Sequence, residues 1–143
     1  MKKTDTLVKL LTADITNKTV LEVACGAASF SISASVCSNN VYCIDLDAGR
    51  LGGEFTENVH FQMMDASKMD YADNTFDTVV LYNAFTHIQS QWLEIKRECK
   101  RVLKTNGVIY VVGTWKMDTY LMMEVFGDKA KWQDGFLIVE IRK

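Results

Sequence analysis

The sequence predicts an α/β fold class, a single domain with a doubly wound, mostly parallel sheet. Two observations lead to this prediction. Apolar segments of strand length alternate along the chain with segments of helical periodicity, as expected where helical crossovers join parallel strands. Three of the strand segments are almost wholly apolar, which is typical of strands that helices cover on both faces. These segments are Val41–Ile44, Thr78–Leu81 and Val108–Val112.

Six strands are expected from apolar segments bounded by polar or turn-forming residues. They are Thr19–Val23, Val41–Ile44, Val59–Met63, Phe76–Leu81, Val108–Gly113 and Phe136–Ile141. Helices are expected between strands or before the first of them, at Asp5–Leu11, Ser29–Cys37, Asp47–Glu57 and Gln91–Leu103. The third of these helices is weakened by three glycines, and Thr119–Phe126 fits a helix or a strand equally well.

The best helical pattern is that of Gln91–Leu103. Its apolar residues recur at helical spacing, and basic residues lie between them. The apolar positions are Trp92, Ile95, Cys99 and Val102, and the basic positions are Lys96, Arg97, Lys100 and Arg101. We expect the apolar stripe to face the sheet and the basic cluster to form a solvated face.

Composition excludes several classes of protein. A chain of 143 residues fits one domain, and 48% hydrophobic with 24% charged residues is ordinary for a globular protein. The formal net charge of -2, with no dense run of Lys or Arg, argues against binding to a nucleic-acid backbone through surface charge. No apolar run approaches the roughly 18 residues of a membrane span, and no signal peptide opens the chain.

Cysteine and histidine usage argues against a metal site. The four cysteines show no C-x-x-C spacing, and neither of the two histidines lies near them at zinc-ligand spacing. We therefore expect no metal, and free buried thiols in a reducing cytoplasm. The cysteines are Cys25, Cys37, Cys43 and Cys99.

An acidic residue stands at or just after the end of each of the first three strands. These residues are Glu22, Asp45 and Asp65, and the first is followed by a turn of small residues, Ala24–Gly26. One such acid on its own is most simply a cap or turn residue. Three in consecutive units favour a ligand site, because ligands of these sheets bind at the carboxyl ends of the strands.

Four segments, in this order and spacing, resemble the class I S-adenosylmethionine-dependent methyltransferases. They are VLEVACGAASF, VYCIDLD, FQMMDASKMDYADNTFDTVV and KRVLKTNGVIYVV, and the resemblance runs from Thr19 to about Val112. It implies a Rossmann-like methyltransferase fold with an antiparallel C-terminal strand, and S-adenosyl-L-methionine as the cofactor. It also implies that residues 1–143 form a single methyltransferase-like domain.

The resemblance implies roles for the residues after the first two strands. The turn Ala24, Cys25 and Gly26 would run under the methionine part of the cofactor, where small residues let backbone N–H groups approach. Glu22 would help to place that turn and the charged amino-acid end. Asp45 would accept hydrogen bonds from both ribose hydroxyls, and Leu46 would pack on the adenine face.

The resemblance assigns the rest of the cofactor site to the third and fourth strands. Asp65 would accept a hydrogen bond from the adenine amino group, and the N–H of Ala66 would donate to a ring nitrogen. The backbone around Leu81 and Tyr82 would close the methionine side.

The turn departs from the glycine-rich pattern of the family. The family has three glycines, whereas this chain has Ala24, Gly26 and Ala28. Alanine disturbs such a turn least if its φ is negative, so we expect cofactor binding to survive, if weaker. The same loss disfavours a nicotinamide-dependent oxidoreductase, whose G-x-G-x-x-G fingerprint keeps only one glycine here.

His87, in the segment LYNAFTHI, is the candidate catalytic residue. Methyl transfer from a sulfonium depends mainly on positioning, and a general base helps when the acceptor carries a proton of high pKa. His87 could be that base or a structural histidine. Trp115 could face the acceptor or cover the sheet edge. Asn83 is followed by no proline, unlike the equivalent residue in methyltransferases of DNA amino groups, which disfavours a nucleic-acid substrate.

Little of the chain is left to form a lid over the acceptor. Only a few residues precede the first helix, and no long insertion follows the fifth strand. We therefore expect an open acceptor site that takes a small molecule or an exposed group, with a homo- or hetero-oligomer as a possible source of the lid. The alternative is a cofactor-binding or vestigial partner subunit without catalysis of its own.

Overall fold

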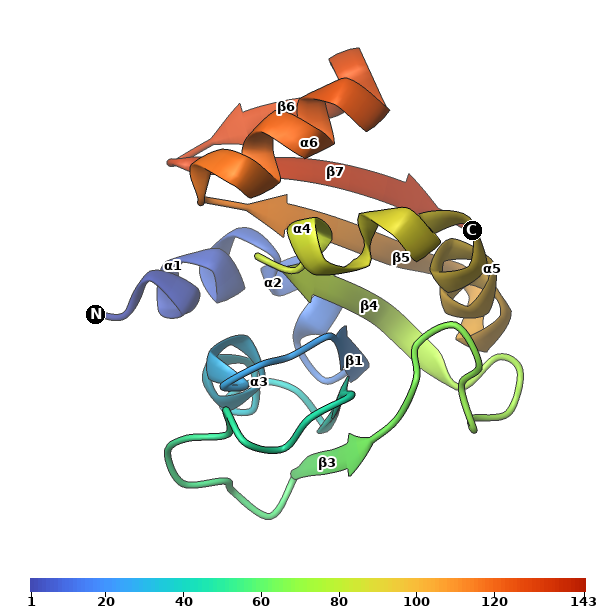
Figure 1. Ribbon diagram of the computed structural model, residues 1–143. Coiled ribbons are helices and arrows are strands. Elements are labelled where there is room, and N and C mark those ends of the chain that lie inside the picture. Colours follow the sequence, from blue (N-terminus) through green and yellow to red (C-terminus); the bar gives the residue numbers. More distant parts are fainter.

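The computed structural model describes residues 1–143 and shows one seven-stranded sheet flanked by helices (Figure 1). The strand order is β3-β2-β1-β4-β5-β7-β6, so the order reverses direction between β1 and β4. Strands β1 to β5 are parallel and β7 is antiparallel to both of its neighbours, which confirms the expected fold class. The strands are β1 (Thr19–Val23), β2 (Asn40–Asp45), β3 (Val59–Met63), β4 (Phe76–Tyr82), β5 (Leu103–Gly113), β6 (Ala130–Gln133) and β7 (Phe136–Arg142).

The helices divide between the two faces of the sheet and bury separate cores. Helices α4, α5 and α6 contribute to the larger core, together with one face of the central strands. Helices α1, α2 and α3 contribute to the second core on the other face, and α1 packs on α3. None of the helices has the length and apolar character needed to span a bilayer. The helices are α1 (Lys3–Leu10), α2 (Thr12–Ile15), α3 (Ser29–Ala34), α4 (Phe85–Ile88), α5 (Trp92–Val102) and α6 (Lys116–Phe126), with short 3-10 turns at Gln89–Gln91 and Gly127–Lys129.

The segment between β2 and β3 contains no helix, so the helix predicted at Asp47–Glu57 was wrong. Gly49, Gly52 and Gly53 break it, and Gly53 has a φ of +74° that a helix does not allow. Because no helix covers this end of the sheet, Leu46 and Met63 are 70% and 59% exposed.

The C-terminal part of the chain also differs from the sequence prediction. The segment that fitted a helix or a strand, Thr119–Phe126, is helical and forms most of α6. Strand β6, which was not predicted, pairs with β7. The turn between them is Asp134-Gly135, with φ of 50° and 84°. Asp-Gly between two strands is a strong hairpin signal, because both residues tolerate positive φ. The sequence therefore did contain the information for β6.

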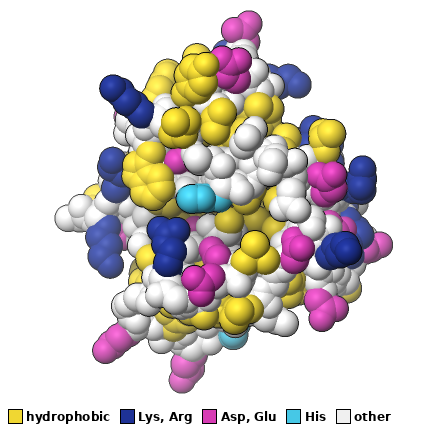
Figure 2. All heavy atoms as spheres, in the orientation of Figure 1, with side chains coloured by type: hydrophobic (Ala, Val, Ile, Leu, Met, Phe, Trp, Pro, Cys, Tyr) yellow, Lys and Arg dark blue, Asp and Glu magenta, His cyan; other side chains and the backbone are white.

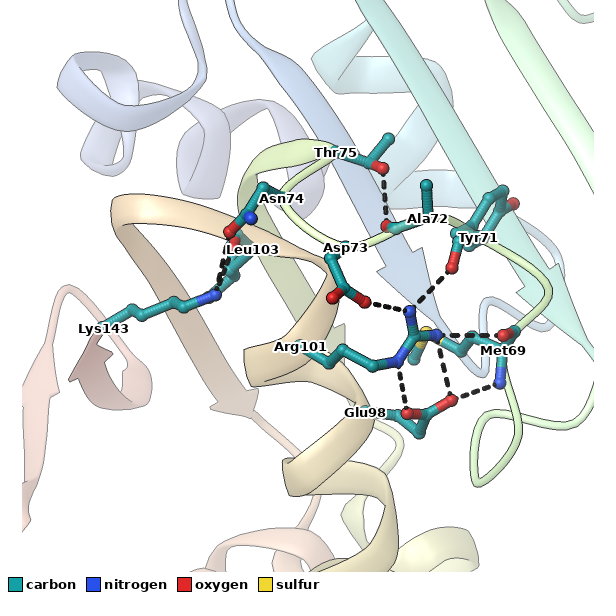
Figure 3. A network of polar contacts seen from close by, with 10 residues as sticks. All are labelled: Met69, Tyr71, Ala72, Asp73, Asn74, Thr75, Glu98, Arg101, Leu103 and Lys143. Atoms are coloured by element: carbon teal, nitrogen blue, oxygen red, sulfur yellow. Dashed lines mark hydrogen bonds and ion pairs between the residues drawn. The ribbon is translucent and has the colours of Figure 1, made fainter.

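The loop after β3 is tied to helix α5 by Arg101 (Figure 3). Arg101 pairs with the carboxylates of Glu98 (2.7 Å) and Asp73 (2.8 Å) and donates to the carbonyls of Tyr71 (2.8 Å) and Met69 (3.0 Å). Glu98 in turn accepts from the N–H of Met69 at 2.7 Å. The expectation of a solvated basic face is therefore wrong for Arg101, which holds the loop that begins at the candidate site.

We predict that Arg101→Met lowers the free energy of unfolding by about 1–3 kcal/mol. The variant loses several charge-assisted hydrogen bonds and leaves polar groups of the loop without partners. Urea unfolding followed by circular dichroism would measure the change. Lys100→Met is the matched control, because Lys100 is exposed and makes no ion pair or side-chain hydrogen bond. An equal, small effect of both substitutions would contradict the anchoring role.

Candidate functional site

A pocket of about 350 Å³ opens at the carboxyl ends of the strands, where the strand order reverses between β1 and β4. This is the place where open α/β sheets bind ligands. Acidic, basic, histidine and hydrophobic side chains meet near the middle of the face in Figure 2. The pocket is lined by Glu22, Ala24, Cys25, Gly26, Ala27, Ser29, Ile44, Asp45, Leu46, Arg50, Met64, Ala66, Tyr82, Asn83, His87, Ile88, Gln91, Ile95 and Trp115.

Most of the residues predicted from the sequence come together in this pocket. Eight of the ten predicted cofactor-binding residues line it, and so does His87. The side chain of Leu81 instead lies in the larger core, where it is fully buried. Asp65 is exposed outside the pocket lining, where its Oδ1 accepts from the N–H (2.9 Å) and the hydroxyl (2.7 Å) of Ser67. Its Oδ2 has no hydrogen-bond partner in the protein.

The turn after β1 keeps a left-handed backbone at two of its three alanines, Ala24 and Ala28. The φ angles are 55° at Ala24, 55° at Gly26 and 63° at Ala28. The condition of negative φ at the alanines is therefore not met, and each alanine costs about 1–2 kcal/mol relative to right-handed backbone. The turn retains the course of a glycine-rich turn at the expense of strain.

Three backbone N–H groups of this turn already have acceptors within the protein. Cys25 donates to the carbonyl of Ile44 at 3.0 Å, and Ala28 donates to the carbonyl of Cys25 at 2.8 Å. Gly26 donates to Oδ2 of Asp45 at 2.9 Å. These bonds fasten the turn to the end of β2 and hold the left-handed residues in place.

The carboxylate of Asp45 is fixed by backbone from two segments. Its Oδ2 accepts from Gly26, and its Oδ1 accepts from the N–H of Asp47 at 3.1 Å. Each carboxylate oxygen has two acceptor sites, so one remains on each oxygen. Asp45 is therefore oriented and still able to accept two further hydrogen bonds from a ligand.

Glu22 is a buried acid at the floor of the pocket, with 1% of its surface exposed. Burial raises its pKa to about 8, although Ser31 opposes this shift by donating its hydroxyl (2.7 Å) and its N–H (3.2 Å) to Oε1. Glu22 is therefore mostly protonated at neutral pH, and a cationic ligand group beside it would favour its ionised form.

The end of β4 is joined to neighbouring elements by Asn83 and by Thr86. The amide of Asn83 donates to the hydroxyl of Thr114 (2.9 Å) and accepts from its N–H (2.8 Å), so it links the ends of β4 and β5. The buried carboxylate of Asp118, on α6, accepts from the N–H and the hydroxyl of Thr86, both at 2.8 Å. Asp118 thereby holds helix α4, which carries His87.

Two charged residues at the site were missed by the sequence analysis. Arg50 lies in the segment that was expected to be helical, and Asp118 lies in the segment before an ambiguous one. Neither residue has a local sequence pattern that indicates a site, because the tertiary fold alone brings both of them to it. The acid at position 118, in the first turn of a helix, looks like an ordinary helix-dipole residue in the sequence.

Residues 21–111 match the family model of the methyltransferase domain, and this chain belongs to that family. The structure is similar to that of a S-adenosylmethionine-dependent methyltransferase from Aquifex aeolicus, with a TM-score of 0.72 and 20% identity over 97% of this chain and 89% of that chain. The cofactor of the family is S-adenosylmethionine. No curated protein sequence matches this chain.

Two other similar structures are longer than this chain. The [4+2]-cyclase SpnF has a TM-score of 0.65 and 22% identity, over 76% of this chain and 44% of that one. The complex between the Haloferax volcanii Trm112 methyltransferase activator and the putative methyltransferase contains a similar chain. Its TM-score is 0.67 and its identity is 17%, over 78% of this chain and 52% of that one. This chain thus spans about half of their length, and at these identities the likeness shows the fold.

The pocket residues fit S-adenosylmethionine. The cofactor has ribose hydroxyls and a cationic ammonium, and the pocket offers the oriented carboxylate of Asp45 and the buried acid Glu22. Its adenine requires an apolar wall, which Ile88, Ile95 and Met64 can supply.

We predict that Ala24→Gly raises the free energy of unfolding by about 0.5–1 kcal/mol. Glycine relieves the left-handed strain at a half-buried position, less its own entropic cost. Ala27→Gly is the matched control in the same turn. Ala27 has no positive φ, so its substitution should lower stability by about 0.5–1 kcal/mol. Loss of stability in both variants, measured by urea unfolding, would contradict the strained turn.

We predict that Glu22→Gln removes a fall in stability at rising pH. The pKa of Glu22 is raised from 4.5 to about 8 on folding, so the unfolded chain releases this proton first. The free energy of unfolding therefore falls between about pH 4.5 and pH 8, by up to roughly 1.4 kcal/mol per pH unit. Urea midpoints from pH 5 to 8.5 should fall more steeply in the wild type than in Glu22→Gln. Parallel pH profiles would show that Glu22 titrates normally.

Proposed function

We propose that this chain binds S-adenosylmethionine in the pocket and transfers the methyl group to a small molecule or to an exposed acceptor group. The observation that carries the proposal is the hydrogen bond of 2.9 Å from Gly26 to Asp45, beside the buried Glu22. The turn has no side chain at Gly26. The oriented carboxylate of Asp45 lies on one side of it, and the largely protonated Glu22 lies on the other. When bound, the cofactor supplies an electrophilic methyl group on a sulfonium that leaves as a neutral thioether.

The proposed contacts of the nucleoside involve residues from three strand ends. Asp45 accepts from the ribose hydroxyls with the acceptor sites that Gly26 and Asp47 leave free. Leu46 packs on the adenine face. Asp65 accepts from the adenine amino group with its unpartnered Oδ2, and the N–H of Ala66 donates to a ring nitrogen.

The proposed contacts of the methionine end come from the β1 turn and the end of β4. Glu22 faces the ammonium and becomes ionised in response, because a nearby cation lowers the pKa of a buried acid. The turn Ala24, Cys25 and Gly26 runs beneath this end, and the backbone at Leu81 and Tyr82 closes its far side.

Catalysis, in this proposal, is chiefly orientation of the acceptor for in-line attack. His87 is exposed at the pocket and lies on the helix that Asp118 holds, so it can reach a bound acceptor. It takes the acceptor proton where the acceptor must lose one. Trp115, also on the pocket wall and 53% exposed, offers an apolar surface on the acceptor side.

The second candidate function is a cofactor-binding subunit that supports a catalytic partner. The left-handed Ala24 and Ala28 favour it, since they are a strained substitute for the usual glycines. The Haloferax complex provides a precedent for a partner of such a domain. Methyl transfer by the purified chain alone to a panel of acceptors would exclude this candidate. Transfer only in the presence of a co-purified partner would support it.

We predict that calorimetric titration with S-adenosylmethionine gives micromolar binding to the wild type and binding at least about tenfold weaker to Asp45→Ala. The variant loses two hydrogen bonds to a charged acceptor, each of about 1.5–3 kcal/mol, and the tie to Gly26. Asp47→Asn is the control, because the side chain of Asp47 bonds only Gly49 locally. Equal losses in both variants, or no binding to a folded wild type, would contradict the proposed site.

A further inference from the structure

Arg50 is the one Lys or Arg side chain among the residues that line the pocket. Its guanidinium lies against the bare face of the β1 turn, since a Cβ placed at Gly26 would be 3.4 Å from both Cζ and Nη1 of Arg50. The resemblance to the family gave no role to this position. The glycine-rich segment between β2 and β3, which forms no helix, brings this side chain back to the pocket.

The guanidinium of Arg50 has no hydrogen bond and no ion pair within the protein. Arg101 and Arg142, in contrast, each pair with two carboxylates. The two acids that most closely precede Arg50 in the sequence, Asp45 and Asp47, accept from backbone N–H groups and not from Arg50. Both oxygens of Asp45 accept from backbone N–H groups, and Oδ1 of Asp47 accepts from Gly49 at 2.8 Å. A planar group of five donors is therefore left free at the pocket.

The carboxylate at the methionine end of the cofactor needs a hydrogen-bond donor in the pocket. Few backbone N–H groups are free to serve as that donor. The N–H groups of Cys25, Gly26 and Ala28 already donate within the protein. Helix α3, which follows the turn, has only six residues. Asp45, and Glu22 once it is ionised beside the ammonium, carry negative charge and repel a carboxylate. Among the charged lining residues, Arg50 alone can pair with an anion.

We infer that Arg50 binds the carboxylate of the methionine moiety and so makes the site select cofactors that carry an intact amino-acid end. This inference rests on the proposed function. The guanidinium matches a carboxylate in geometry as well as in charge, because it can form two parallel N–H to oxygen bonds. Arg50 and Glu22 then divide the zwitterion between them, with Arg50 on the carboxylate and Glu22 on the ammonium.

Calorimetric titration with two ligands tests the inference directly. Decarboxylated S-adenosylmethionine keeps the nucleoside, the sulfonium and the ammonium but lacks the carboxylate. We expect the wild type to bind S-adenosylmethionine about tenfold more tightly than the decarboxylated ligand, as for one charge-assisted pair near the surface. Arg50→Gln should weaken S-adenosylmethionine by about the same factor and leave the decarboxylated ligand unchanged or bound more tightly.

Two further variants serve as controls. Arg97→Gln removes the same charge from the exposed face of α5 and should change neither affinity. Arg50→Lys keeps the charge but loses the paired donors, so it should retain part of the preference for S-adenosylmethionine. Arg50 is exposed and makes no hydrogen bond or ion pair within the protein, so its variants should unfold at the urea midpoint of the wild type.

The alternatives give different results. Equal weakening of both ligands by Arg50→Gln would place Arg50 on the nucleoside and overturn the inference. Tighter binding of both ligands would show that Arg50 blocks the pocket, and an unchanged pair of affinities would exclude any role in binding. Failure of the folded wild type to bind either ligand would instead overturn the proposed function, and this inference with it.

Discussion

The hydrogen bond between the N–H of Gly26 and Oδ2 of Asp45 joins the turn after β1 to the end of β2. Parallel strands place these two points at the same edge of the sheet, but strand pairing itself ends at Val23 and Ile44. Beyond that pair, the turn is held by this bond and by the bond from Cys25 to Ile44. The same bond orients Asp45 toward the pocket. Backbone shape and ligand chemistry therefore depend on one contact.

This contact also explains how the turn tolerates its alanines. A left-handed alanine persists only where surrounding structure leaves the chain no alternative. Here the bonds on Cys25, Gly26 and Ala28 fix the backbone between two left-handed alanines. The buried Glu22 adds a second unfavourable feature a few residues away. Strain and a desolvated acid thus gather at the pocket, whereas each of the two cores behind it is built from close-packed apolar side chains.

The sequence was informative where a local pattern determines the outcome. The strands β1 to β5 and β7, the buried stripe of α5 and the three strand-end acids follow from periodicity and position. The helix predicted at Asp47–Glu57 is absent because three glycines disfavour a helix there, although a helix is the usual connection between parallel strands. Strand β6 was not predicted, although Asp134-Gly135 is a hairpin signal that indicates a strand before β7. Arg50 and Asp118 could not be predicted, since their roles arise only when distant segments meet.

The two sides of the pocket are held by different means. On the proposed nucleoside side, backbone bonds fix Asp45, and Arg101 anchors the loop that follows Asp65 and Ala66. On the proposed acceptor side, α4 is held by one oxygen of Asp118 and by Phe85 and Ile88, which are buried in the larger core, while the other oxygen of Asp118 is buried without a partner. Such an orphaned oxygen costs about 1–3 kcal/mol. That cost offsets part of the stability gained from the two bonds to Thr86, so the burial of Phe85 and Ile88 contributes much of what holds α4 in place. One side of the pocket is therefore fixed mainly by hydrogen bonds of the backbone, and the other mainly by the packing of buried side chains.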